Sequence, residues 1–381
     1  MQKIFFFVAA LLSASLVNAQ SYNKYIADIS SQVDSVLYKV YDYERIGVKN
    51  SGSVGFDSAT KWLIKKYEDL GYSAEIDTFR FGGTQSYNVI VELPTNVSDE
   101  WIVVGAHFDS KSGSMGANDN GTGVIATLEI AELLKDVDLQ RNLRIINFGA
   151  EEDGLIGSAH YVRDVLDVAD NVRLMFNLDQ LGGSLGQDNS KIVCERDEGS
   201  NPSENNEASY RFTDTLASMI SLYTNLTPVI SYAYSSDYEP FEDAGYVITG
   251  LYQESTDPNN HTPRDLSVNM DFEATTEVIK GAVAATMYFA GIPDNVSVSQ
   301  VYSQTFRIYP NPTYGQFKVT ERSPGHSTLS IFNSVGQEVY TADYLTNQPI
   351  DISHLPVGSY SVSILNHDNS HKTFAKLIIA R

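Results

Sequence analysis

The chain has 381 residues, of which 42% are hydrophobic, 19% charged and 11% aromatic, a composition typical of a globular protein with two domains. Its formal net charge of -22 argues against a nucleic-acid partner, because phosphate binding needs clustered Lys and Arg side chains. Cys194 is the only cysteine, so no intrachain disulfide is possible. It lies in a strand-like run, and we expect it to be a small buried residue.

The N-terminal segment 1–19 has the pattern of a secretory signal peptide. Lys3 precedes an apolar run over residues 4–12, and Val17-Asn18-Ala19 follows at the cleavage positions. We therefore expect cleavage after Ala19. No other run is long and apolar enough for a membrane span, so the sequence predicts an exported protein without a stable membrane span.

Residues 20–293 are predicted to form one α/β domain. Apolar residues at helical spacing indicate helices at 22–43, 57–70, 121–135, 157–165, 204–223 and 271–289. Short apolar runs indicate strands at 74–81, 87–93, 101–106, 143–148, 172–178 and 246–252. Strands that alternate with helices predict a central mixed, mostly parallel sheet that is covered by helices.

The character of the chain changes after this domain. A polar linker is expected at 294–303, and short β runs separated by Gly, Pro and Asn occupy 304–381. These runs lie at 316–320, 327–332, 338–342, 359–365 and 373–379. Their spacing predicts a small all-β C-terminal sandwich. Residues 304–381 contain six Lys and Arg against five Asp and Glu, so the negative charge lies almost entirely in the first domain.

Side chains with metal-binding chemistry follow several predicted strands or their loops. A Glu-Glu pair such as Glu151-Glu152 is by itself most often a solvated acidic loop. Sites in open α/β sheets, however, form at the carboxyl ends of the strands. Five candidate ligands fall at such positions: His107, Asp119, Glu152, Asp179 and His261. We therefore expect them to form one site.

Two His and three carboxylates without a thiolate suit zinc in a hydrolytic site, or manganese or cobalt. Two metal ions would need a bridging carboxylate. Asp119 is the natural bridge, because it sits in a tight loop before a predicted helix. Of the two adjacent glutamates, Glu152 can bind metal while Glu151 takes the proton of a water molecule.

The motifs resemble those of the co-catalytic zinc aminopeptidases of clan MH, peptidase family twenty-eight, in particular the compact, secreted bacterial leucyl-aminopeptidase type. The resemblance covers residues 21–293. The stretches that carry it are Gly105-Ala106-His107-Phe108-Asp109-Ser110, Ala117-Asn118-Asp119-Asn120-Gly121-Thr122-Gly123, Gly149-Ala150-Glu151-Glu152-Asp153-Gly154, Asn177-Leu178-Asp179 and His261-Thr262. It implies an enzyme that releases N-terminal residues from peptides with a free N-terminus.

The resemblance also implies residue roles and two Zn²⁺ per chain. Both ions would share Asp119, with Glu151 as the general base that passes a proton from water to the leaving amine. Asp109 would lie behind His107 as a catalytic carboxylate that orients the imidazole. One zinc would be bound by His107, Asp119 and Asp179, and the other by Asp119, Glu152 and His261. The resemblance further implies a cis peptide bond between Asp119 and Asn120.

The sequence departs from the family in two places. Many relatives have Ser-Asp-His where this chain has Ser236-Asp237-Tyr238. A nearby Tyr in relatives stabilises the tetrahedral intermediate. Tyr232 and Tyr234 both lie near that position; we assign the role to Tyr234, and the alternative is that both are packing aromatics. Gln180 follows Asp179 where relatives that prefer apolar side chains often have an apolar residue, which argues against a simple leucine preference.

The C-terminal segment resembles the type A sorting domain of the bacterial type IX secretion system. The resemblance rests on Tyr309-Pro310-Asn311-Pro312-Thr313, Gly315, the turn Leu355-Pro356-Val357-Gly358-Ser359-Tyr360 and the Lys-bearing end 372–381. It implies export through the periplasm to the outer-membrane surface or the medium, with the secretion machinery as a partner. A spacer or a carbohydrate-binding module is the alternative.

Two other functions remain open for the first domain. Glutaminyl cyclases are relatives that carry a His-x-Asp-Ser-Lys stretch, as this chain does from His107 to Lys111, but use a single zinc. A non-catalytic binding protein on the same fold is the second alternative. Such proteins have usually lost metal ligands or the general base, whereas this chain has all five candidate ligands and Glu151.

Overall fold

The computed structural model describes residues 33–167, 169–199 and 202–291 of the first part of the chain. Of the remainder it describes 307–311, 313–320, 327–332, 338–344, 348–366 and 371–380. The expected signal peptide and the expected linker at 294–303 lie outside these residues. The chain divides into two compact units, Met1–Asp294 and Asn295–Arg381, which are treated separately below.

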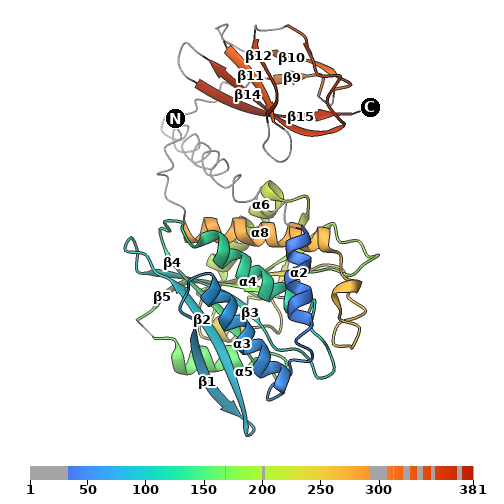
Figure 1. Ribbon diagram of the computed structural model, residues 1–381. Coiled ribbons are helices and arrows are strands. Elements are labelled where there is room, and N and C mark those ends of the chain that lie inside the picture. The colour runs from blue at the N-terminus through green and yellow to red at the C-terminus, as the bar shows by residue number, and fades with distance from the viewer. Residues whose placement is uncertain are drawn as a thin grey trace. The chain divides into compact units, whose positions relative to one another are not determined.

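The first unit is built on an eight-stranded sheet with the order β1-β2-β4-β3-β5-β8-β6-β7. Figure 1 labels β1 to β5 of this sheet. The strands are β1 (Glu75–Phe81), β2 (Thr84–Leu93), β3 (Glu100–His107), β4 (Asn142–Phe148), β5 (Asn171–Leu178), β6 (Lys191–Arg196), β7 (Thr227–Tyr232) and β8 (Ile248–Gln253). The four central strands β4, β3, β5 and β8 run parallel to one another. Their carboxyl ends therefore lie at the same edge of the sheet.

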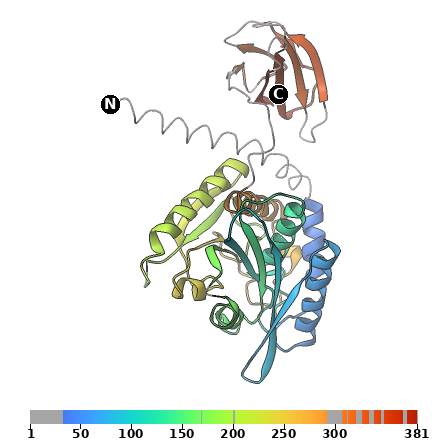
Figure 2. The ribbon, with the colours of Figure 1, turned by 90° about the vertical axis from the view of Figure 1, so that its left-hand side faces the viewer.

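Helices cover both faces of this sheet. They are α2 (Val33–Glu44), α3 (Val54–Asp69), α4 (Gly121–Leu134), α5 (Ile156–His160), α6 (Asn206–Tyr223), α7 (Glu239–Asp243) and α8 (Phe272–Ala290). One core cluster unites the apolar faces of α2, α3, α4, α6 and α8 with the sheet. A second lies between the sheet and the segments that carry Tyr161, just after α5, and Phe241 of α7. In Figure 2, α5 (green) lies on the opposite side of the strands from α2 and α3 (blue).

The alternation of side chains along the central strands explains this three-layer arrangement. On β3, Val104 packs into the first core cluster and Val103 into the second. On β5, Phe176 packs into the first core cluster and Met175 into the second. Both side-chain directions are apolar because both faces are covered, which is why these strands read as continuous apolar runs in the sequence.

The second unit contains two antiparallel sheets. They have the orders β13-β10-β9 and β12-β11-β14-β15. The strands are β9 (Arg307–Tyr309), β10 (Gln316–Thr320), β11 (Ser327–Phe332), β12 (Glu338–Tyr344), β13 (Ile350–Asp351), β14 (Gly358–Asn366) and β15 (His371–Ile379). Phe317 and Val319 of the first sheet share one core with Leu329, Val362 and Leu377 of the second.

The predicted fold class is confirmed in both units: a mixed, mostly parallel sheet with helices, and a small β sandwich. The sequence interpretation missed the edge strand β7 and the short helix α7. It also treated 157–165 as one helix, whereas α5 ends at His160 and a π-helical turn follows at Tyr161–Val165. Among the described residues, no helix is long and apolar enough to cross a membrane.

Candidate metal centre

The candidate ligands lie at the carboxyl ends of the parallel strands. β3 ends at His107, and Asp179 directly follows β5. Glu151 and Glu152 follow β4, after Ala150, whose φ of 59° belongs to the left-handed region. The loop beyond β8 carries His261, whose φ is 58°. These turns direct side chains from distant parts of the sequence to one edge of the sheet.

Asp119 reaches the same edge from the loop before α4. Its peptide bond to Asn120 is cis, which confirms the expectation for this bond. Asn120 is the N-cap of α4 and accepts a hydrogen bond at Oδ1 from the backbone N–H of Gly123, 3.0 Å away. The same side chain donates from Nδ2 to the carbonyl of Leu178 at 2.9 Å, which ties the loop to the end of β5.

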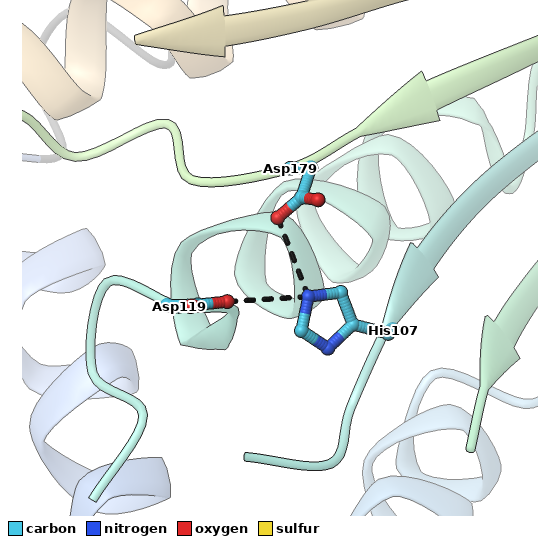
Figure 3. A group of neighbouring side chains, drawn as sticks. All are labelled: His107, Asp119 and Asp179. Carbon is cyan, nitrogen blue, oxygen red and sulfur yellow. Dashed lines mark hydrogen bonds and ion pairs between the residues drawn. The ribbon is translucent and has the colours of Figure 1, made fainter. Parts of the chain in front are cut away.

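Two groups of three side chains meet at Asp119. In the first, Nε2 of His107 lies 3.3 Å from Oδ1 of Asp119 and 3.3 Å from Oδ1 of Asp179 (Figure 3). In the second, Nε2 of His261 lies 3.0 Å from Oδ2 of Asp119 and 3.3 Å from Oε2 of Glu152. The ligand atoms within each group lie within 4.8 Å of one another. The two oxygens of Asp119 therefore face different histidines.

The arrangement fits divalent cations. Oε1 of Glu152 is buried and accepts no hydrogen bond from the described residues. A buried carboxylate oxygen without a donor is costly, and a cation held between the carboxylates offsets that cost. Imidazole and carboxylate ligands without a thiolate suit zinc. The site thus meets the chemical requirements of a zinc centre.

The charges of the site compensate one another in the absence of a cation. Burial raises the pKa of Asp119, but the contacts with His107 and His261 outweigh it and bring the pKa to about 2. Contacts with Asp119 and Glu152 raise the pKa of His261 to about 10. Burial lowers the pKa of His107, but the charges of Glu151 and Asp179 reverse this and hold the pKa well above its usual value. Metal binding must therefore displace protons from both histidines.

Glu151 lines the site beside these groups. Its Oε2 lies 3.9 Å from Nε2 of His107. Burial raises its pKa to about 10; His107 opposes this rise, and the charges of Asp179 and Asp237 add to it. A bound cation would reverse this effect, because a nearby positive charge favours the carboxylate.

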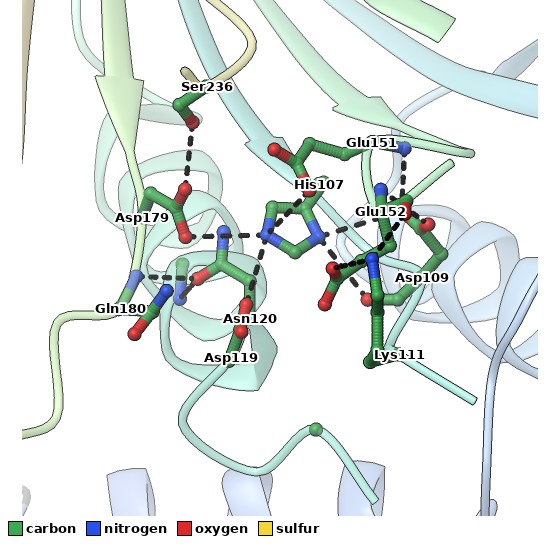
Figure 4. Close-up of polar contacts among 12 residues, drawn as sticks. His107, Asp109, Lys111, Asp119, Asn120, Glu151, Glu152, Asp179, Gln180 and Ser236 are labelled. Carbon is green, nitrogen blue, oxygen red and sulfur yellow. Dashed lines mark hydrogen bonds and ion pairs between the residues drawn. The ribbon is translucent and has the colours of Figure 1, made fainter. Parts of the chain in front are cut away.

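Asp109 supports both His107 and the glutamate pair. It is buried, and its Oδ1 lies 3.5 Å from Nδ1 of His107. Its two oxygens also accept the backbone N–H groups of Glu151 and Glu152, each at 3.2 Å (Figure 4). The sequence predicted the first contact; the second could not be predicted from the local motif. One carboxylate therefore fixes the end of β4 relative to the end of β3.

Two supporting residues were missed. Ser236 donates a hydrogen bond from Oγ to Oδ2 of Asp179 at 2.7 Å and accepts one from Nδ2 of Asn177 at 2.8 Å. Asp265 is buried and accepts the backbone N–H groups of Asn118 at 2.8 Å and Asp119 at 3.1 Å. The only sequence signal for Asp265 is its position four residues after His261.

The centre opens into a cavity of about 330 Å³ that is also lined by Leu155, Gln180, Tyr234, Tyr252 and Asn260. Of the two tyrosines considered in the sequence, Tyr234 lines this cavity. Tyr232 instead lies on β7 and packs against the Arg196 guanidinium, 5.0 Å from its ring centroid. Cys194 is buried, as expected.

Comparisons with known proteins point to one family for the first unit. A family model described as Peptidase family M28 matches residues 88–286, more than half of the chain, and one described as a secretion system C-terminal sorting domain matches residues 307–380. Aminopeptidase YwaD of Bacillus subtilis is 37% identical over 194 residues, which cover 49% of this chain and 40% of the relative. The chain thus matches less than half of the length of that relative.

Solved structures show the same fold at low identity. An aminopeptidase from Aneurinibacillus sp. strain AM-1 has a TM-score of 0.62 at 17% identity, over 70% of this chain and 97% of that structure. A glutaminyl cyclase of Porphyromonas gingivalis has a TM-score of 0.58 at 17% identity, over 68% of this chain and 98% of that structure. At this identity the likeness concerns the fold alone.

Proposed function

Because the chain belongs to peptidase family M28 and ends in a secretion system C-terminal sorting domain, we propose that it is a secreted metallo-aminopeptidase. The observation that carries the proposal is the convergence of two His and three carboxylates around Asp119. The relative named above is an aminopeptidase, which supports the same activity. The substrates would be peptides with a free N-terminus.

Two Zn²⁺ per chain are proposed. His107, Asp119 and Asp179 would hold one ion, and Asp119, Glu152 and His261 the other, with one oxygen of Asp119 on each side. Ser236 orients Asp179, and Asp265 orients the loop of Asp119 through two backbone N–H groups. When bound, the metal pair would polarise the scissile carbonyl and acidify a water molecule.

The remaining steps are assigned to side chains of this chain. Glu151 would take a proton from the attacking water and deliver it to the leaving amine, because it lines the cavity beside both ligand groups. Asp109 would keep Glu151 in place through its bond to the backbone N–H. Tyr234, which lines the same cavity, would donate its O–H to the developing oxyanion. The acidic walls would attract the α-amino group of the substrate.

Export is proposed to depend on both ends of the chain. Residues 1–19 would be a signal peptide, 20–293 the catalytic domain, 294–303 a linker and 304–381 the sorting domain. The protein would cross the periplasm and reach the cell surface or the medium, with the secretion machinery as its partner.

The decisive experiment compares Glu151→Gln with Asp153→Asn, an exposed carboxylate two residues away. Glu151→Gln should bind zinc normally but lose at least a hundredfold in kcat, since a general base contributes roughly 10²–10⁴. Asp153→Asn should retain activity within about twofold. The assay should measure release of N-terminal residues from free and N-acetylated peptides beside zinc content. Unchanged turnover in Glu151→Gln, or equal rates on blocked peptides, would contradict the proposal.

The alternative function is a glutaminyl-peptide cyclase with one zinc. It is supported by the structural likeness to the glutaminyl cyclase and by the His107-Phe108-Asp109-Ser110-Lys111 stretch. Lys111 donates from Nζ to the carbonyl of Glu152 at 2.7 Å, beside the second ligand group. One tightly bound zinc per chain and a cyclised product from N-terminal Gln peptides would favour the cyclase. A non-catalytic binding protein would bind peptides without releasing either product.

A further inference from the structure

Gln180 lines the cavity, and hydrogen bonds hold its backbone on both sides. It follows Asp179 and is 7% exposed, with a φ of 50°. Its backbone N–H donates to Oδ1 of Asn120 at 3.2 Å, and its carbonyl accepts from the N–H of Gln253 at 3.0 Å. These bonds join it to the loop of Asp119 and to the end of β8. Its side chain therefore starts from a backbone with little freedom.

The side-chain amide of Gln180 is oriented by a neighbour on β8. Tyr252 donates from its O–H to Oε1 of Gln180 at 3.3 Å. This bond occupies the amide oxygen and leaves the Nε2 group without a hydrogen-bond partner among the described residues. Because Gln180 lines the cavity, that amino group is available as a donor to a bound molecule.

Asn260 supplies an unsatisfied acceptor to the same cavity. Its Oδ1 is buried and accepts no hydrogen bond from the described residues. Buried polar atoms are almost always paired, so this unpaired oxygen, on a residue that lines the cavity, calls for a ligand or a water molecule. The rings of Tyr234 and Tyr252 meet edge to face, with centroids 5.7 Å apart, and give the cavity an aromatic wall.

We propose that this cavity selects peptides whose N-terminal side chain ends in a carboxamide, which means Gln or Asn. The carbonyl of such a side chain can accept from Nε2 of Gln180, and its amino group can donate to Oδ1 of Asn260. An aliphatic side chain would leave both protein groups unsatisfied and desolvated. This inference rests on the proposed aminopeptidase function, of which it names the substrate class.

The test compares Gln with Met as the first residue of otherwise identical substrates, because the two side chains have similar length and only Gln forms hydrogen bonds. For the zinc-loaded protein, we expect kcat/KM to be roughly tenfold or more higher for the Gln substrate, as one hydrogen bond of about 1–1.5 kcal/mol provides. Gln180→Met should lower this ratio to about one. Gln180→Glu keeps an acceptor for Tyr252 but removes the donor, and it should also abolish the preference for Gln.

Gln187→Met is the matched control, because Gln187 is exposed and does not line the cavity. It should leave the ratio unchanged. A wild-type protein that prefers Met, or a Gln180→Met variant with the wild-type ratio, would overturn the inference. Calorimetric binding of free L-glutamine and L-methionine to the zinc-loaded protein gives a second readout that does not depend on turnover.

The outcomes separate this inference from the proposed function. If no peptide is hydrolysed but L-glutamine binds at least tenfold more tightly than L-methionine, the aminopeptidase function fails and the cavity assignment stands. A cyclised product from Gln substrates would have the same meaning. If peptides are hydrolysed without a preference for Gln or Asn, the function stands and the cavity assignment fails.

Discussion

Glu195 is a buried carboxyl group outside the two ligand groups. It lies on β6, is 2% exposed, and has Tyr238 as a hydrogen-bond partner. Tyr238 in turn accepts the backbone N–H of Tyr234 at its hydroxyl, 3.0 Å away. Burial raises the pKa of Glu195 to about 8, above its ordinary 4.5. This residue links the strand to the segment that carries Tyr234.

The raised pKa predicts a pH-dependent contribution of Glu195 to stability. Between pH 4.5 and about 8 the folded state keeps a proton that the unfolded state releases, so this contribution falls as the pH rises through that window. Glu195→Gln removes the titration and retains an acceptor for Tyr238. Relative to wild type, its free energy of unfolding should be unchanged near pH 4.5 and higher near pH 8 by an amount on the order of 4–5 kcal/mol.

Urea unfolding of the metal-free protein at several pH values tests this prediction. Glu207→Gln is the control, because Glu207 lies exposed on α6 and should leave the pH profile unchanged. If the free energy of unfolding of Glu195→Gln differs from that of the wild type by the same amount at every pH from 4.5 to 8, this carboxyl group does not titrate in that window.

At the residue scale, the sequence predicted the side chains that follow strand ends and missed those that support them. His107 ends one run that reads clearly as a buried strand and Asp179 directly follows another, and Glu152 lies four residues after a third. The contacts of Ser236 and Asp265 join segments 57 and 146 residues apart, and no local pattern encodes such a pairing. A hydrogen-bonding side chain in a loop has many possible partners until the fold is known.

At the scale of elements, the start of α4 determines where Asp119 lies relative to β5. Gly123 permits this close approach, because a Cβ at this position would lie 2.4 Å from the carbonyl oxygen of Leu178 and 2.5 Å from Oδ1 of Asn120. The backbone oxygen belongs to the residue before Asp179. A side chain at Gly123 must therefore move α4 away from the end of β5 or displace the candidate ligands.

Gly123→Ala should weaken zinc binding by at least tenfold, because Asp119 would no longer be aligned with Asp179 at the end of β5. Gly281→Ala in α8 is the control: its Cβ would meet Cδ1 of Ile220 at 2.2 Å, but this is the flexible end of a side chain within the helical layer. That variant should lose stability by about 1–3 kcal/mol and keep the zinc affinity. Zinc titration with a competing chelator measures the zinc affinity of each variant, and urea unfolding measures its stability. Equal zinc affinities in the two variants would contradict the argument.

The predictability of the elements depended on how completely they are buried. The central strands and α8 are buried along most of their length, and their type was predicted correctly. β7 is an edge strand that begins Thr227-Pro228 and exposes Ile230 and Tyr232, so it shows no clear alternation. α7 has only five residues and too few for a helical period to emerge.

At the scale of the whole molecule, the two units have separate hydrophobic cores. The clusters of the first unit draw on residues up to Ala290, and the cluster of the second begins with Ile308. The sheets are also separate among the described residues, since no strand of one unit pairs with a strand of the other. The negative charge belongs to the first unit, so the two units differ in surface chemistry as well as in fold.

Separate cores predict that a chain ending after residue 293 will fold and keep its activity. Its kcat/KM should equal that of the full-length protein within about twofold, because no residue of the candidate site lies beyond His261 and the supporting Asp265. In a host with type IX secretion, however, the shortened chain should accumulate in the periplasm, since the sorting domain is absent. Cell fractionation with activity assays on each fraction measures both effects. If the shortened protein reaches the medium as efficiently as the full chain, residues 304–381 are not required for sorting. If it folds but loses activity, the C-terminal unit contributes to catalysis.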